Sequence, residues 1–429
     1  MYIHEVNIML KHIQPKKSFL FIVIQLIFVC SLQIHASEID SVAKSILTSA
    51  GVQGGLVVHA GCGDGQLTAA LHQNDGFLVH GLERDESQVK AARNYIQSLG
   101  MYGTISIDRW DGLTLPYIDN SVNLLVMEER GKVQPNEIRR VLCPKGVAFI
   151  KKNGQWSKTI KPRPGGMDEW THYLYGPNNN AVSQDNEVRP LRHLQWIGGP
   201  KFSRHHDHMS SSSAIVSANN RNFYIFDEGS PVSIQLPSKW KLIARDAFNG
   251  KILWERDMGP WQTQLTRLKS GPASLPRRIV AIGDTVYVTL AIDAPVTALD
   301  AATGKTIRTY KGTRNTEEIL FSNGILFLAI KDSPFDLSPK RRGYDSWLKK
   351  DTRRILAVEA ASGTILWEKS WRWVAPVTLA VDDNQVCFFD GETIVSLHRE
   401  SGEKQWQSET LGKNGPIPSY FAPTLVLYK

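Results

Sequence analysis

Residues 57–65, of sequence VVHAGCGDG, constrain the first half of the chain more than any other stretch. Two β-branched residues end an apolar run that predicts a buried strand, and residues 66–72 predict the start of a helix. The three alternating glycines between them permit positive φ angles and let main-chain amides approach a bound group. The stretch therefore predicts a strand, a tight ligand-binding turn and a helix.

Apolar runs alternate with helical patterns from residue 37 to about residue 161, which predicts an α/β domain with a mostly parallel sheet. We expect strands at 56–59, 76–82, 104–107, 122–127 and 147–150, the last closing the sheet, and helices at 41–50 and 87–99. Glu83 ends the second of these strands. In dinucleotide folds a carboxylate at that place accepts the ribose hydroxyls, because it faces the same crevice as the glycine loop. The alternative is that Glu83 only caps the next helix.

Two more motifs follow in order, Trp110-Asp111-Gly112 with a Leu-Pro-Tyr at 115–117, and RVLCPKG at 140–146. Together with the glycine loop and Glu83 they resemble the class I S-adenosylmethionine-dependent methyltransferases, which have a Rossmann-like fold. The resemblance implies a cofactor site for S-adenosylmethionine made by Gly61, Cys62, Gly63, Gly65, Glu83 and Asp111. By that resemblance the loop holds the methionine end, Glu83 the ribose and Asp111 the adenine amino group. It indicates neither a catalytic residue nor the methyl acceptor.

The chain departs from this family at three positions. His59 stands where the family usually has an acid, Asn123 where it usually has Asp, and Lys145 where it usually has Gly. The missing carboxylate at 59 weakens the prediction of catalysis more than that of the fold. Two functions stay open: a methyltransferase whose second region recruits or positions the substrate, and a non-enzymatic binding protein with a degenerate methyltransferase fold.

The second half of the chain repeats itself. Residues 162–166, of sequence PRPGG, mark a boundary. We expect a linker over 162–212 that includes an ordered loop at 167–185 and a candidate ring-closing strand at 191–197. The repeats are ARDAFNGKILWE at 244–255, ALDAATGK at 298–305, AVEAASGTILWE at 357–368 and SGEKQW at 401–406. Each predicts a strand, a glycine turn and a second strand, with two more strands upstream, which is typical of a β-propeller.

These turns resemble the pyrroloquinoline-quinone-type propeller repeat, in which the Trp docks each blade on its neighbour. Within residues 213–429 we expect four blades, starting near Ser213, Arg277, Glu318 and Val377, and a fifth that opens at 422–428, so that the ring is truncated and open. The quinone itself is not expected, because the region has Cys387 alone and no adjacent Cys pair. A quinone-dependent dehydrogenase is therefore the least favoured function, and a scaffold that presents strand edges to a protein partner is preferred.

Two basic stretches and one histidine-rich run are further candidate sites. Residues 139–163 hold eight Lys or Arg and no acid, which equals the net charge of +8, and we interpret them as a solvated linker and not a nucleic-acid surface. The basic stretch 331–354 predicts an exposed loop. The His-His-Asp-His run at 205–208 predicts a polar loop and no metal site, because neighbouring side chains of a strand point to opposite faces.

The N-terminus predicts a targeting segment. Lys11, Lys16 and Lys17 precede an apolar run at 19–32, and Ala36 can end a signal-peptide cleavage site. We therefore expect residues 1–36 to direct export to the periplasm or cell envelope. An uncleaved membrane anchor is the alternative, and either would make this segment the chain's sole membrane contact. Export conflicts with the cytosolic location of S-adenosylmethionine.

Overall fold

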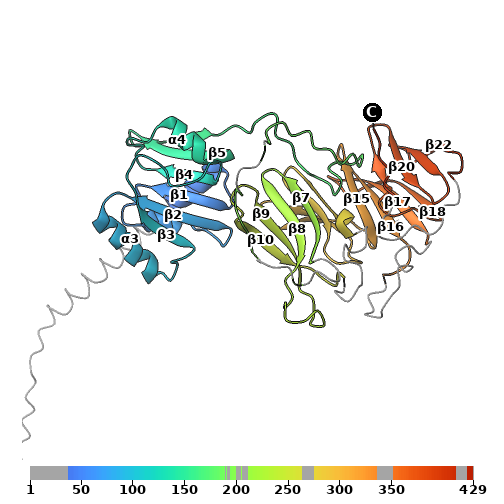
Figure 1. Cartoon of the computed structure of the whole chain (residues 1–429), viewed down its shortest axis with the longest axis horizontal. Coiled ribbons are helices and arrows are strands. Elements are labelled where there is room, and N and C mark those ends of the chain that lie inside the picture. The colour runs from blue at the N-terminus through green and yellow to red at the C-terminus, as the bar shows by residue number, and fades with distance from the viewer. Residues whose placement is uncertain are drawn as a thin grey trace, which may run out of the picture.

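The computed structural model describes residues 37–188, 190, 194–199, 204, 211–262, 275–335, 351–411 and 423–428. They form an α/β domain followed by four four-stranded sheets (Figure 1). The predicted export segment, the histidine-rich run at 205–208 and most of the predicted basic loop lie outside the described residues. No helix among the residues that the structure describes is long and apolar enough to cross a membrane.

The first domain follows the predicted order of elements. Residues 37–50 are helical, and then come β1 (Gly55–Ala60), α2 (Gln66–Ala70), β2 (Phe77–Glu83), α3 (Glu86–Ser98), β3 (Ile105–Arg109), β4 (Val122–Met127), α4 (Pro135–Val141), β5 (Leu142–Lys152) and β6 (Gln155–Ile160). The sheet order is β3-β2-β1-β4-β5-β6, and every pairing is parallel except β5–β6. The prediction of an α/β domain with a mostly parallel sheet is confirmed.

The end of this sheet differs from the prediction. The strand expected at 147–150 is only part of β5, and β6 follows it as an antiparallel edge strand. Asn153 and Gly154 join the two strands with φ angles of 51° and 78°. An Asn-Gly pair is a strong hairpin signal because both residues tolerate positive φ, so the sequence held the clue that the prediction missed.

Both faces of this sheet are buried, which explains why its strands are almost continuously apolar. Val57 of β1 packs in one core cluster with Val89, Ala92 and Ile96 of α3. Its neighbour Val58 faces the other side, in a cluster that includes Ile138 and Val141 of α4. Side chains alternate along a strand, so helices can cover both faces, and the loops at the strand ends are left to form a site.

The second region consists of antiparallel meanders. Its sheets are β7 (Ser212–Ala218), β8 (Arg221–Asp227), β9 (Trp240–Asp246) and β10 (Ile252–Asp257); β11 (Ile279–Ile282), β12 (Thr285–Thr289), β13 (Val296–Asp300) and β14 (Thr306–Thr309); β15 (Thr316–Ser322), β16 (Ile325–Lys331), β17 (Arg353–Glu359) and β18 (Ile365–Trp371); and β19 (Ala380–Val381), β20 (Gln385–Phe389), β21 (Ile394–His398) and β22 (Lys404–Gln407). A single 3-10 turn, η1 (Leu275–Arg278), precedes β11. The four predicted four-stranded units are confirmed. The described parts of the expected closing strand and of the fifth unit, residues 194–197 and 423–428, form no strand.

An aromatic ring joins each sheet to the next. The indole N–H of Trp254, at the outer strand of the first sheet, donates to the carbonyl of Ala301 in the second sheet at 3.0 Å. Equivalent bonds run from the Tyr310 hydroxyl to Ala360 (2.6 Å) and from the Trp367 indole to Arg399 (2.8 Å). We call these side chains docking rings. The turns that they cover, at 301–304, 360–363 and 399–402, are the docking turns.

In the docking turns beneath Trp254 and Trp367, the final glycine allows this contact. A Cβ atom on Gly304 would lie 2.6 Å from the Trp254 ring, and one on Gly402 would lie 2.7 Å from the Trp367 ring. Both glycines have positive φ, which other residues rarely adopt. The turn at 247–250 of the first sheet is covered in the same way by Trp196, whose indole donates to Ala247 at 2.9 Å. Trp196 comes from the segment that was expected to close a ring, so that segment docks on the first sheet.

The predicted ordered loop lies across all four sheets. Main-chain amides of their first strands, at Ser217, Ala281, Phe321 and Val381, donate to acceptors at Trp170, Thr171, His172 and Pro177 over 2.7–3.0 Å. His172 is buried and accepts with its side-chain Nε2, while the other three accept with carbonyl oxygens. The loop therefore ties together sheets that are far apart in the sequence.

Candidate functional site

The glycine loop at the carboxyl end of β1 has the geometry that its sequence predicts. Gly61, Gly63 and Gly65 have φ angles of 76°, 54° and 84°. Gly65 is also the N-cap of α2, and a Cβ atom there would lie 3.1 Å from the Cβ of Ala92 in α3. Backbone conformation requires glycine at all three positions, and close helix packing requires it at the third.

The carboxylate of Glu83 lies against this loop. β2 is the parallel neighbour of β1, so the two strands end at the same edge of the sheet. One carboxylate oxygen of Glu83 accepts the N–H of Gly63 at 2.9 Å, and the other accepts the N–H of Arg84 at 2.7 Å. The alternative, that Glu83 caps the following helix, is wrong, because Asp85 is the N-cap of α3 and accepts from Ser87 and Gln88.

Asp111 lies beyond the end of β3, the next strand along this edge. Its Oδ1 accepts the N–H groups of Leu113 and Thr114 at 2.7 and 3.1 Å, which closes a tight turn. Gly112 has a φ of 80°, and a Cβ atom there would lie 2.7 Å from Cδ of Arg84. The loop, Glu83 and Asp111 thus follow three neighbouring strand ends at one edge of the sheet.

The main-chain N–H of Cys62 donates to the carbonyl of Leu82 at 3.1 Å, and its carbonyl accepts the N–H of Gly65 at 3.0 Å. Its thiol is buried and lies over Gly81, where a Cβ atom would be 3.0 Å from the sulfur. Burial, and then the negative charge of Glu83, raises the pKa of the Cys62 thiol to about 12. A neutral thiol packed toward the sheet is a structural group, so the side chain of Cys62 carries no charge toward a ligand.

His59 marks the strongest departure from the predicted family pattern. It is 2 % exposed, its Nδ1 lies 2.8 Å from Oγ1 of Thr68, and its Nε2 has no hydrogen-bond partner. Burial lowers the pKa of His59 to about 4, although the nearby acids Glu128, Glu83 and Asp64 oppose the shift. The imidazole is therefore neutral at pH 7 at a position where the family has an anion.

Glu128 is a residue of this edge that the sequence analysis missed. It follows β4, which pairs with β1 on the side opposite to β2, and its carboxylate lies 3.0 Å from Nζ of Lys151. The available signal was an acid placed directly after a strand that neighbours the glycine-loop strand.

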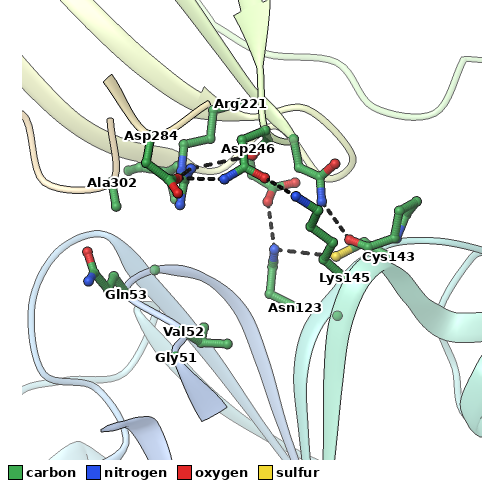
Figure 2. Close-up of a pocket in the computed structure, with 16 residues that line it drawn as sticks. Gly51, Val52, Gln53, Asn123, Cys143, Lys145, Arg221, Asp246, Asp284 and Ala302 are labelled. Atoms are coloured by element: carbon green, nitrogen blue, oxygen red, sulfur yellow. Dashed lines mark hydrogen bonds and ion pairs between the residues drawn. The ribbon is translucent and has the colours of Figure 1, made fainter. Parts of the chain in front are cut away.

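The opposite, amino-terminal edge of the sheet is joined to the first sheet of the second region (Figure 2). Asn123, near the start of β4, donates its Nδ2 to Asp246 at 2.6 Å, and its Oδ1 accepts Nδ2 of Asn249 at 2.7 Å. The same oxygen accepts the N–H of Leu56 at 2.8 Å. Asn123, noted only as a family departure, is therefore a contact between the two regions.

A polar cavity of about 230 Å³ lies in this seam. Lys145 and Asn123 line it from the first domain, and Arg221, Asp246 and Asp284 line it from the sheets (Figure 2). Its charged groups have polar partners: Lys145 donates to the side-chain oxygen of Asn219 at 2.7 Å, and Arg221 lies 3.0 Å from Asp284. Across the residues that the structure describes, no group of three or more His, Cys, Asp or Glu side chains could hold a metal ion.

Comparison with known proteins supports the first domain. Residues 57–146 match the family model described as "Methyltransferase domain". The curated "Methyltransferase GfsG" of Streptomyces halstedii is 33% identical over 97 residues, which are 21% of this chain and 34% of that protein. The chain thus spans about one third of the length of this curated relative.

Solved structures match about a quarter of the chain. A Methanococcus maripaludis protein assigned as an S-adenosyl-L-methionine-dependent methyltransferase is 23% identical, covers 28% of this chain and 58% of its own, and has a TM-score of 0.25. The geranyl diphosphate C-methyltransferase of Streptomyces coelicolor is 19% identical, with 26% and 44% covered and a TM-score of 0.23. TM-scores this low add no argument of their own. By its family match and its sheet, the segment at 57–146 is a methyltransferase domain with a Rossmann-like fold.

Proposed function

We propose that the first domain binds S-adenosylmethionine at the carboxyl edge of its sheet and transfers the methyl group to an acceptor. One observation carries the proposal: the Glu83 carboxylate lies 2.9 Å from the amide of Gly63, within a loop of three glycines with positive φ. A carboxylate beside an open glycine loop matches a ligand that carries ribose hydroxyls next to an amino-acid chain.

The residues present fit this cofactor, which supplies an electrophilic methyl group. Gly61, Cys62, Gly63 and Gly65 would form the turn around its methionine end, Glu83 would accept from the ribose hydroxyls, and Asp111 would accept from the adenine amino group. Glu83 and Asp111 are bonded to main-chain amides, which fixes their positions. Rate enhancement would come from holding the acceptor in line with the methyl group, which requires no general base.

The four sheets serve, in this proposal, as a quinoprotein-like propeller scaffold. They join the domain through Asn123 at the amino-terminal edge of the strands, whereas the glycine loop lies at the carboxyl edge. The sheet region therefore leaves the cofactor edge open to the acceptor and offers its own outer surfaces to a protein partner.

The second candidate is a non-enzymatic binding protein. The neutral, buried imidazole of His59 favours it, because a family acid at this place would help to order the methionine end of the cofactor. Ligand binding without methyl transfer would then be the activity of the first domain.

Isothermal titration of the full chain with S-adenosylmethionine tests the proposal. The wild-type chain should bind with saturation, and Glu83→Ala should weaken binding at least tenfold, because it removes the ribose acceptor. Glu86→Gln is the matched control, since Glu86 is an exposed acid of α3 that bonds no loop amide. Absence of heat from the folded wild-type chain would contradict the proposal, and binding without product in a methyl-transfer assay with candidate acceptors would favour the second candidate.

A further inference from the structure

The cavity in the seam between the two regions, which we call the seam cavity, is lined by two cationic side chains. Lys145 reaches it from β5 of the first domain and Arg221 from the start of β8, opposite the loop at 51–54 (Figure 2). Its volume of about 230 Å³ is several times the share of one water in the liquid, about 30 Å³. The seam cavity is therefore large enough for a small molecule of several non-hydrogen atoms.

Lys145 has a backbone conformation that favours glycine. Its φ is 62°, in the left-handed region, and its main-chain N–H donates to the carbonyl of Lys161 at 2.8 Å. The family that the first domain resembles usually has glycine here, and lysine in this conformation carries backbone strain. In return, the Lys145 ammonium crosses the seam to Oδ1 of Asn219, 2.7 Å away. The lysine thus places a positive charge at the wall of the seam cavity.

Both cations keep donors that no described residue accepts. The ammonium of Lys145 has three N–H groups, and its one acceptor is the neutral amide oxygen of Asn219. Arg221 bonds only through Nη1, to the carbonyl of Asn219 at 3.4 Å and to Asp284 at 3.0 Å. Nε and Nη2 form the other edge of the Arg221 guanidinium and have no partner in the described part of the chain. Two parallel N–H groups on such an edge match the two oxygens of a carboxylate or phosphate.

The two acids of the seam cavity already accept from other groups. Asp246 accepts from the side chain of Asn123 and from two main-chain amides. Asp284 accepts through Oδ1 from Arg221 and from Nδ2 of Asn219. The formal charges of the two acids and the two cations cancel. Recognition of a ligand therefore depends on the directed N–H groups of the cations and not on a net positive field.

We propose that the seam cavity binds a small molecule that carries a carboxylate or phosphate group. Arg221 supplies the bidentate edge for this oxyanion and Lys145 supplies a further donor, so the bound group links the sheet region to the first domain. Val52 and Leu253 line the same cavity and offer apolar contact to the rest of the molecule. The site lies at the amino-terminal edge of the strands, away from the glycine loop, and is independent of the proposed methyl transfer.

Isothermal titration of the full chain with inorganic phosphate and with malonate, at constant ionic strength in chloride, tests the proposal. We expect saturable binding of at least one probe, and the tighter probe assigns the recognised group as phosphate or carboxylate. Lys145→Gly should weaken this binding at least tenfold, because it removes the ammonium. Lys158→Met is the matched control: Lys158 is an exposed lysine of β6 that donates to one neutral oxygen, the carbonyl of Ser49 at 2.7 Å, and does not line the cavity.

Thermal unfolding separates ligand binding from a structural role of Lys145. Without a probe, Lys145→Gly should unfold at no lower temperature than the wild-type chain, because glycine suits the φ of 62°. A saturating probe should raise the midpoint of the wild-type chain and leave that of the variant unchanged. Arg221→Gln should also weaken binding at least tenfold, since it removes the bidentate edge. Equal affinity of the wild-type and Lys145→Gly chains, or no saturable binding of either probe, would overturn the proposal.

Discussion

His59, which is neutral at pH 7, lies in β1 two residues before the glycine loop. Because His59 is buried beside β2 and β4, three nearby acids fail to keep its proton, and its Nε2 is left without a partner. An anion at this place would add to the negative charge of Glu83 and Glu128. With His59 in place of an acid, the carboxyl edge of the sheet carries less negative charge. Protonation of this buried imidazole at low pH also destabilises the fold.

Stability should fall as pH is lowered from 7 to 4.5, partly through His59. Its folded pKa of about 4 lies below the ordinary 6.5, so the unfolded chain binds more protons in this range and stability is lost as pH falls. The contribution is roughly 2–3 kcal/mol. Between pH 7 and pH 4.5, the free energy of unfolding of His59→Gln should fall by less than that of the wild-type chain, and the difference should equal this contribution. Urea denaturation at both pH values measures it. The exposed His398→Gln should behave like wild type, and a variant profile equal to wild type would contradict the shift.

Asn123→Asp should separate the two regions. It keeps the oxygen that accepts from Leu56 and Asn249 but replaces the donor to Asp246 by a second carboxylate. Burial already raises the pKa of Asp246, so two facing carboxylates should cost about 3 kcal/mol at pH 7. Urea unfolding measures the loss, which should shrink at pH 4.5 because one shared proton restores a donor.

The exchanged pair Asn123→Asp with Asp246→Asn is the control. An amide at 246 can donate back to the carboxylate at 123, and its oxygen can still accept from Phe248 and Asn249. The double variant should recover most of the lost stability. Equal destabilisation by the single and double variants would mean that the bond between the two residues does not hold the interface.

At the scale of elements, the docking rings determine how the sheets associate. Each ring combines one hydrogen bond with apolar contact over a glycine turn, and one variation shows what is essential. In the second sheet Arg308 takes the register position of the Trp, and Tyr310 reaches the next turn with its hydroxyl instead. An aromatic ring with a donor is therefore required, whereas an indole is not.

Trp367→Ala should destabilise the sheet region by about 3–5 kcal/mol, because it empties a buried contact and leaves the Arg399 carbonyl without its donor. Trp406→Ala removes the same residue type from the same register position at an exposed site and should change stability by about 1 kcal/mol or less. Thermal unfolding monitored by circular dichroism compares the two. Equal losses would show that the rings act within their own sheets and not between sheets.

The two proposed activities, methyl transfer and partner binding, lie on different parts of the molecule. The glycine loop lies at the carboxyl edge of the parallel sheet, the seam at Asn123 joins the regions at the opposite edge, and the sheet of β19–β22 lies far from the first domain (Figure 1). Methyl transfer and partner binding can therefore proceed without sharing a surface. The compartment in which they would occur depends on the N-terminal segment.

Residues 1–40 fused to alkaline phosphatase, which is active only after export, should give activity in a bacterial host. The basic residues followed by the apolar run at 19–32 are the features that predict this result. Replacement of two central leucines or isoleucines of that run by Arg is the control and should abolish the activity, since a charged core is not translocated. An inactive fusion with the unchanged segment would place the chain in the cytosol, where S-adenosylmethionine is made.

The sequence by itself determined the features that depend on local backbone chemistry. The glycines of the loop, the carboxylate that ends β2 and the repeated glycine turns each need a specific residue type at a specific place. The pattern of neighbouring residues therefore sufficed to predict the parallel sheet, the glycine turn after β1 and the four sheets. The Asn153-Gly154 hairpin also depends on local backbone chemistry, although it was not predicted from the sequence.

Tertiary structure alone decided the features that join distant segments. The residues around Asn123 do not predict its bond to Asp246, and those around Trp196 do not predict its bond to Ala247. The donors to the main-chain acceptors at 170–178 come from segments 47 to 249 residues away. The burial that neutralises His59 likewise comes from the strands packed around it. The packing of the whole chain determines which partner a side chain meets and how far it is removed from water. Residue type determines only which bonds that side chain can make.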